Sequence, residues 1–79
     1  MVLEQAKQRA EQISGVSNVA YDLLTILQNK LQAISALEEY KIDAQQAGDQ
    51  EVLNLLAQLE QREREDVDKL KGLTVQRLH

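Results

Sequence analysis

The chain has 79 residues and a net charge of −4, and it contains no Cys, Pro, Trp or Phe. This length allows one small domain, and the lack of Cys excludes disulfides and thiolate metal sites. Acidic and basic residues are interleaved, which leaves no basic face for nucleic acid, and no apolar run approaches the roughly 20 residues that cross a bilayer. We therefore expect a soluble cytoplasmic protein that gains stability by forming an oligomer.

A weakly amphipathic arm is expected over residues 1–14. Its apolar residues gather on one side and include Val2, Leu3, Ala6, Ala10 and Ile13. Residues 14–18 interrupt this pattern, because Gly15 lowers helix stability by about 1 kcal/mol relative to Ala and Ser17 or Asn18 can cap a following helix. The helix either breaks at Gly15 or runs straight through it. In both cases the arm is expected to pack on the rest of the bundle or on a partner chain.

A long helix is predicted over residues 18–46, and it carries more apolar residues than one neighbouring helix can cover. One stripe consists of Leu23, Leu27, Ile34 and Leu37, with Lys30 at the position that would continue it. Val19 and Ile26 lie on the same line, and four further apolar residues widen it: Ala20, Leu24, Leu31 and Ile42. This broad coverage predicts that the helix packs against more than one partner helix.

Residues 47–49 form the clearest interruption of the helical pattern. Gly48 suits the left-handed conformation that ends a helix, and Asp49 is a preferred cap for the next helix. So short a connection predicts two antiparallel neighbouring helices. The second helix is expected over residues 49–71, where Gly72 ends it and residues 73–79 either form a tail or continue as a further turn.

The helix expected over residues 49–71 repeats the pattern of an apolar stripe with one charge in it. The stripe consists of Val52, Leu56, Leu59, Val67 and Leu70, and its missing middle member is Glu63. The outer face is interpreted as solvated because it is rich in polar and charged residues. These residues are Gln58, Glu60, Gln61, Arg62, Arg64, Glu65, Asp68 and Lys69.

Lys30 and Glu63 thus place opposite charges in two stripes that face each other. Lys30 lies 18 residues before Gly48 and Asp66 lies 18 residues after it. Both therefore have the same height in an antiparallel hairpin, and Glu63 is about one turn away. A charge inside an apolar stripe costs several kcal/mol unless it is paired or binds a metal. We predict a structural ion pair of Lys30 with Glu63 or Asp66.

The residues around the turn resemble the helical hairpin of the ferritin-like, rubrerythrin-type superfamily. The resemblance covers roughly residues 20–73 and is carried by EYKIDAQQAGDQEV at residues 39–52 and LEQRERED at residues 59–66. Its most specific element is the register between Gly48 and Glu63. The resemblance implies an all-α fold with a single domain over residues 1–79, in which two hairpins from two chains join as a four-helix bundle.

In that superfamily each hairpin supplies a Glu from its first helix and a Glu-x-x-His from its second, around a di-metal centre. Here Glu63 stands at the Glu of the motif, Asp66 stands at its His, and Lys30 falls about at the first-helix Glu. These departures imply a bundle without a working metal site or cofactor. The alternative is an iron or manganese site built from carboxylates alone, with Glu63 and Asp66 of two chains helped by Glu38 or Glu39.

Neither a catalytic residue nor a cofactor-binding site is indicated by the remaining residues. His79 is the only histidine, no Ser or Thr has a base at a useful spacing, and the three glycines are isolated. The favoured function is a non-enzymatic helical protein-interaction or structural module, a homodimeric ferritin-like bundle. The alternative is a small metal-binding, oxidoreductase-like bundle whose carboxylate site is shared between two chains.

Overall fold

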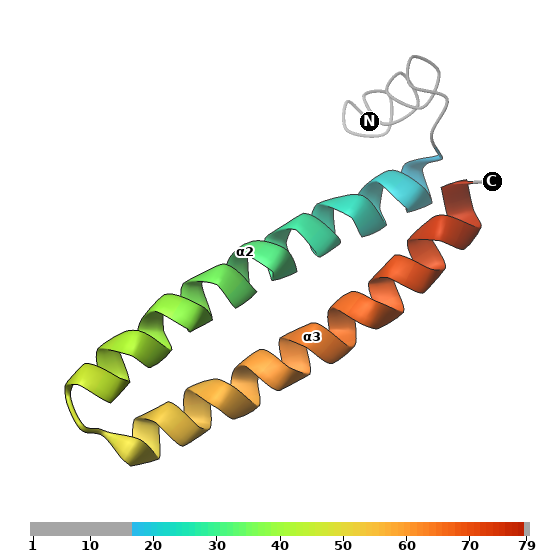
Figure 1. Ribbon diagram of the computed structural model, residues 1–79. Helices are drawn as coiled ribbons and strands as arrows, with labels where there is room; N and C mark the ends of the chain where they lie inside the picture. Colours follow the sequence, from blue (N-terminus) through green and yellow to red (C-terminus); the bar gives the residue numbers. More distant parts are fainter. Residues whose placement is uncertain (1–16, 79) are drawn as a thin grey trace, which may run out of the picture.

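The fold is a hairpin of two long antiparallel helices, seen in a computed structural model that describes residues 17–78. Helix α2 spans Asn18–Gln46 and helix α3 spans Gln50–Leu78, and they lie side by side along their length (Figure 1). The described residues contain no strand. The expectation of an all-α helical hairpin is confirmed, while the arm expected over residues 1–14 lies outside the described residues.

Helix α2 begins where the sequence offers a hydrogen-bonding cap. Ser17 has an extended backbone, and its side-chain oxygen accepts a hydrogen bond of 3.1 Å from the backbone N–H of Ala20. The bond satisfies one of the four N–H groups that lack a partner at the start of a helix. Of the two caps that the sequence offers, Ser17 is therefore the one used.

The turn between the helices combines a left-handed glycine with a second cap. Gly48 has a φ of +69°, its N–H donates to the carbonyl of Gln45 at 3.1 Å, and the N–H of Asp49 donates to Ala44 at 2.9 Å. This pair of bonds is the Schellman motif that closes a helix. The Asp49 carboxylate then accepts from the N–H of Val52 at 3.1 Å, which starts α3. One short segment thus satisfies both helix ends and reverses the chain.

The two helices meet along a seam with alternating spacings of three and four residues, the repeat of a coiled coil. On α2 the seam residues, all buried or half-buried, are Ala20, Leu23, Leu27, Lys30, Ile34, Leu37, Lys41 and Ala44. On α3 they are Leu53, Leu56, Glu60, Glu63, Val67, Leu70 and Thr74. Small residues lie at both ends of the seam and charged residues lie in two of its layers.

The sequence assigned the stripe of the second helix incorrectly at two positions. Val52 and Leu59 are 41% and 38% exposed, whereas Leu53 is half-buried and Glu60 is only 7% exposed. Glu60 therefore does not belong to the solvated outer face on which the sequence analysis placed it. The physical reason is that α3 has apolar residues on two adjacent sides. The side that packs against α2 is the one whose charged residues meet opposite charges on α2.

The predicted end of the second helix at residue 71 is also wrong, because α3 continues through Gly72 to Leu78. Gly72 has an ordinary helical backbone, and within residues 17–78 Gly48 is the glycine with a positive φ. Beyond it, Thr74 returns to the seam and is buried, and Arg77 lies in the last turn, where a cation offsets the helix dipole. Packing against the start of α2 therefore outweighs the poor helix propensity of one glycine.

Gly72→Ala is expected to raise the free energy of unfolding by about 1 kcal/mol, because alanine favours a helix interior and no atom outside the adjoining helix backbone lies within 4 Å of the added methyl group. Gly48→Ala is the opposite control and should lower it by about 1 kcal/mol, since its positive φ strains any residue with a Cβ. Urea unfolding measures both changes. A destabilised Gly72→Ala variant would mean that the helix ends at this glycine.

Candidate functional site

The first charged layer of the seam joins Lys30 to two carboxylates of α3. Lys30 Nζ lies 3.2 Å from Glu63 Oε2 and 3.2 Å from Asp66 Oδ2. The side chains of Lys30 and Glu63 are each 27% exposed, so water reaches this layer from one side. The hydrogen bond to Asp66 and then the one to Glu63 raise the pKa of the Lys30 ammonium above its ordinary value. The structure thus brings together the three residues that the sequence grouped.

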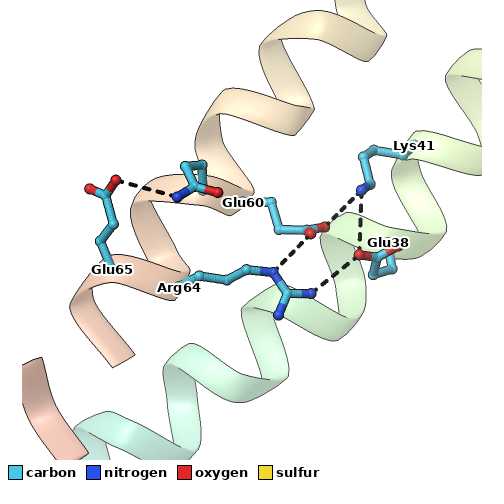
Figure 2. A network of polar contacts seen from close by, with 6 residues as sticks. Glu38, Lys41, Glu60, Arg64 and Glu65 are labelled. Atoms are coloured by element: carbon cyan, nitrogen blue, oxygen red, sulfur yellow. Dashed lines mark hydrogen bonds and ion pairs between the residues drawn. The ribbon is translucent and has the colours of Figure 1, made fainter. Parts of the chain in front are cut away.

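The second charged layer lies nearer the turn and is drawn in Figure 2. Lys41 Nζ lies 3.2 Å from Glu60 Oε1 and 3.3 Å from Glu38 Oε1. Arg64 completes the ring, with Nε 3.1 Å from Glu60 Oε2 and Nη2 3.5 Å from Glu38 Oε1. Two cations and two anions therefore alternate around one level of the hairpin.

Glu60 is the most buried charge of this ring. Its side chain is 9% exposed, and Lys41 meets Glu60 Oε1 at ion-pair distance but outside hydrogen-bond geometry. Burial alone raises the pKa of the Glu60 carboxyl, but the neighbouring cations Lys41 and Arg64 lower it by more, so its pKa lies below the ordinary value. The close contact with Glu60 is the main cause that raises the pKa of Lys41.

The sequence analysis missed this second layer, although a signal for it existed. Lys41 lies seven residues after the buried Ile34, and Glu60 lies seven residues before the buried Val67. A strict seven-residue repeat therefore places both charges in the seam. Apolar periodicity alone does not indicate these two charges, because each has an apolar neighbour that also fits a stripe: Ile42 beside Lys41 and Leu59 beside Glu60.

The two layers fix the alignment of the helices more than they add stability. Exposed or half-exposed ion pairs contribute little, since water already solvates the separated charges. A slip of α3 by one heptad would instead place Lys41 at the level of an apolar seam residue and leave Glu60 without Lys41, its cation on α2. The unpaired charges would be costly in every wrong register. The arrangement therefore selects one antiparallel alignment.

Three of the four carboxylates considered for a metal site face cations, and the fourth, Glu39, is exposed. Glu63 and Asp66 both contact Lys30, and Glu38 contacts Lys41 and Arg64. Among residues 17–78, no group of three or more His, Cys, Asp or Glu residues is arranged to hold a metal ion. An ammonium group between two candidate ligands repels a cation, so the donor set of this hairpin does not fit a metal.

Stability should depend on pH at both ends of the scale because of these layers. The pKa values of Lys30 and Lys41 are raised above 10.5, so their stabilisation is present below pH 10.5 and is lost as the pH rises through the folded-state values. The pKa of Glu60 is lowered below 4.5, so its stabilisation is present above pH 4.5 and is lost as the pH falls through the folded-state value.

A comparison with Glu60→Gln isolates the contribution of Glu60 to stability at acidic pH, since glutamine does not titrate. We expect the wild type to exceed this variant in free energy of unfolding between about pH 5 and pH 10, and the difference to shrink as the pH falls below about 4. Urea unfolding at each pH measures this difference. A difference that stays constant down to pH 2 would show that Glu60 has the same pKa in the folded and unfolded chain.

The ion pair between Glu38 and Arg64 identifies one broad face of the hairpin. Glu38 directly follows the seam residue Leu37, and Arg64 directly follows the seam residue Glu63. Leu37 and Glu63 are every second member of the seam on their helices. In an antiparallel pair, the residues that directly precede the seam members in between line the opposite face. We call this opposite face the apolar face. Its residues are Val19, Ile26, Ala33 and Tyr40 of α2 and Val52, Leu59, Asp66 and Leu73 of α3.

The apolar face extends from the turn to the open end of the hairpin. Its six large side chains are between 38% and 56% exposed, and they come in equal number from the two helices. Asp66 is the one charged residue among the eight, and it is paired with Lys30. Exposed apolar surfaces of this extent mark interaction sites in soluble proteins. The described part of the chain thus carries an exposed apolar surface, and the charged layers hold the two helices that form it in one alignment.

No protein-family model matches the chain, and no curated protein or solved structure is significantly similar to it. Within residues 17–78, neither helix is both long and apolar enough to cross a membrane. The resemblance to ferritin-like hairpins therefore stays a prediction from the sequence.

Proposed function

We propose that the chain is a non-enzymatic helical interaction module that works as a homodimer, in which two hairpins pack as a ferritin-like four-helix bundle without a metal site. The observation that carries the proposal is the apolar face, which covers one whole side of the hairpin and includes Ile26 and Leu59. A lone two-helix hairpin buries little apolar surface, and the chain has no disulfide to stabilise it. A second hairpin would supply the missing half of a core.

The charged layers support an interaction role over a catalytic one. Each ionised side chain of the layers contacts an opposite charge on the facing helix, as in the contact between Lys30 and Glu63. Such groups are held in place and are not available for proton transfer to a substrate. What the hairpin presents outward is a shaped apolar surface.

The melting temperature is expected to rise with protein concentration, because folding and association are coupled when two hairpins share one core. Circular dichroism melts over a hundredfold range of concentration test this expectation. A melt that stays constant over the whole range would show that one hairpin folds without a partner, and it would count against the homodimer.

A further inference from the structure

A second group of exposed apolar residues lies at the open end of the hairpin, on the face that carries Glu38 and Arg64. Leu31 and Leu24 lie one and two heptads before Glu38, and Leu78 lies two heptads after Arg64, so all of them share this face. Two further apolar residues lie one helical turn before a leucine of the group. We call the group the open-end patch, and its members, between 39% and 56% exposed, are Tyr21, Leu24, Leu31, Val75 and Leu78.

The open-end patch is much shorter than the apolar face. On α2 it runs from Tyr21 to Leu31, about 15 Å of helix, because the charged residue Glu38 takes the next position on this face. The apolar face runs from Val19 to Tyr40 on the same helix, about 32 Å. A second hairpin suits the long face, whereas the open-end patch suits a short segment.

The arm expected over residues 1–14 lies outside the described residues, and it joins the hairpin beside the open-end patch. The start of α2 and the end of α3 lie at the same end of the hairpin (Figure 1). Ser17 has a φ of −61° and a ψ of 153°, so the helical path of α2 does not continue into the residue before it. As a helix, the arm would be about 21 Å long, enough to cover the patch and too short for the apolar face.

The apolar residues of the arm match those of the open-end patch when both are counted from Ser17. Residues at equal distances from a short turn between antiparallel helices lie at about the same height. The pairs at equal distance are Leu3 with Leu31 at 14 residues, Ala10 with Leu24 at 7 and Ile13 with Tyr21 at 4. An arm that turns back at Ser17 therefore brings its apolar stripe to the height of the patch.

We propose that residues 1–14 fold back as a helix antiparallel to α2 and cover the open-end patch of their own chain. This docking removes apolar surface of both the arm and the patch from water. It leaves the apolar face as the long exposed surface that a second chain can cover. The proposal goes beyond the homodimer and does not depend on it, because the arm and the second chain would use different faces of the hairpin.

A disulfide between introduced cysteines tests the proposal, because the chain has no Cys of its own. Ala10→Cys/Leu24→Cys places the two thiols at matching heights of the arm and the open-end patch. Ala10→Cys/Ile26→Cys is the matched control, because Ile26 lies within one turn of Leu24 but belongs to the apolar face. Both variants are oxidised at roughly 1 µM, where a thiol of the same chain is strongly favoured over one of an unassociated chain. The mass of the denatured, unreduced product is then measured.

We expect Ala10→Cys/Leu24→Cys to lose both free thiols at the mass of one chain, 9.0 kDa, and to do so roughly tenfold faster than the control. A product of twice that mass would overturn the proposal, because the arm would then cover the patch of a partner chain. Equal rates in the two variants, or slow closure in both, would overturn it as well, since the arm would then have no preferred place on the patch.

Stability of the full-length chain gives a second measurement that needs no disulfide. If Leu3 covers Leu31, Leu3→Gln removes most of what Leu31→Gln would lose, so the double variant should melt close to the less stable single variant. Leu3→Gln with Leu55→Gln is the control, because Leu55 is 53% exposed and lies near the turn, outside the open-end patch. The two changes of this control pair should add. Additive changes in both pairs would overturn the proposal.

Discussion

Glu60→Leu is expected to destabilise the protein by more than the double variant Lys41→Leu/Glu60→Leu. The single substitution leaves Lys41 half-buried with only Glu38 nearby, because the 3.2 Å contact to Glu60 is gone. The double variant leaves Glu38 and Arg64 paired at the surface and fills the seam with two apolar residues. Removing one partner of a buried pair costs more than replacing both.

Thermal and urea unfolding at a fixed protein concentration measure this difference, and we expect the single variant to melt several degrees below the double one. Glu65→Leu is the matched control, because Glu65 is an exposed carboxylate of the same helix whose hydrogen bond is to Gln61. That variant should melt close to the wild type. If Glu60→Leu and Glu65→Leu change stability equally, Glu60 is solvated as freely as a surface residue.

Ile26→Gln is expected to weaken dimer formation by roughly thirtyfold, whereas Ile42→Gln should leave it nearly unchanged. Both isoleucines belong to α2 and are similarly exposed in the hairpin, at 45% and 54%. Ile26 belongs to the apolar face and Ile42 does not. Covering the exposed half of one isoleucine contributes about 1 kcal/mol, and a two-fold dimer contains two copies, so the loss is about 2 kcal/mol.

Sedimentation velocity on dilution series of the two variants measures their dissociation constants. Glutamine is uncharged and a good helix former, so neither substitution disturbs α2 itself. Equal weakening by both variants would show that the dimer, if formed, uses a surface other than the apolar face.

Local signals were sufficient to predict the hairpin. Gly48 and Asp49 satisfy the ends of two helices within a few residues, and this chemistry does not depend on the rest of the fold. The distance from Gly48 also placed Lys30 and Asp66 at one height, because an antiparallel turn leaves no freedom in that count. Each of these inferences uses residues close together in the chain or a rigid helix between them.

The choice of the packed side of α3 could not be predicted in the same way. Val52 and Leu59 are as apolar as Leu53 and Leu56, so hydrophobicity alone does not tell the seam from the apolar face. The decision depends on α2, where Lys41 requires an anion and Glu60 supplies it. An apolar surface that stays exposed in the hairpin has the same residue types as its core. The sequence of one chain therefore does not distinguish the two.

The end of α3 required tertiary information as well. Gly72 breaks helices by propensity, yet the turn beyond it packs Thr74 against the start of α2. That contact joins residues at opposite ends of the described chain, and no local rule anticipates it. Propensities of about 1 kcal/mol are regularly overridden by such packing.

Sedimentation equilibrium of the wild-type protein tests the homodimer most directly. The chain has a mass of 9.0 kDa, and we expect a single species of twice that mass at concentrations of about 10 µM and above. The same experiment on Ile26→Gln should show a mixture of the two masses at the same concentration. A wild-type protein that is fully helical and has a mass of 9.0 kDa over the whole range would contradict the account.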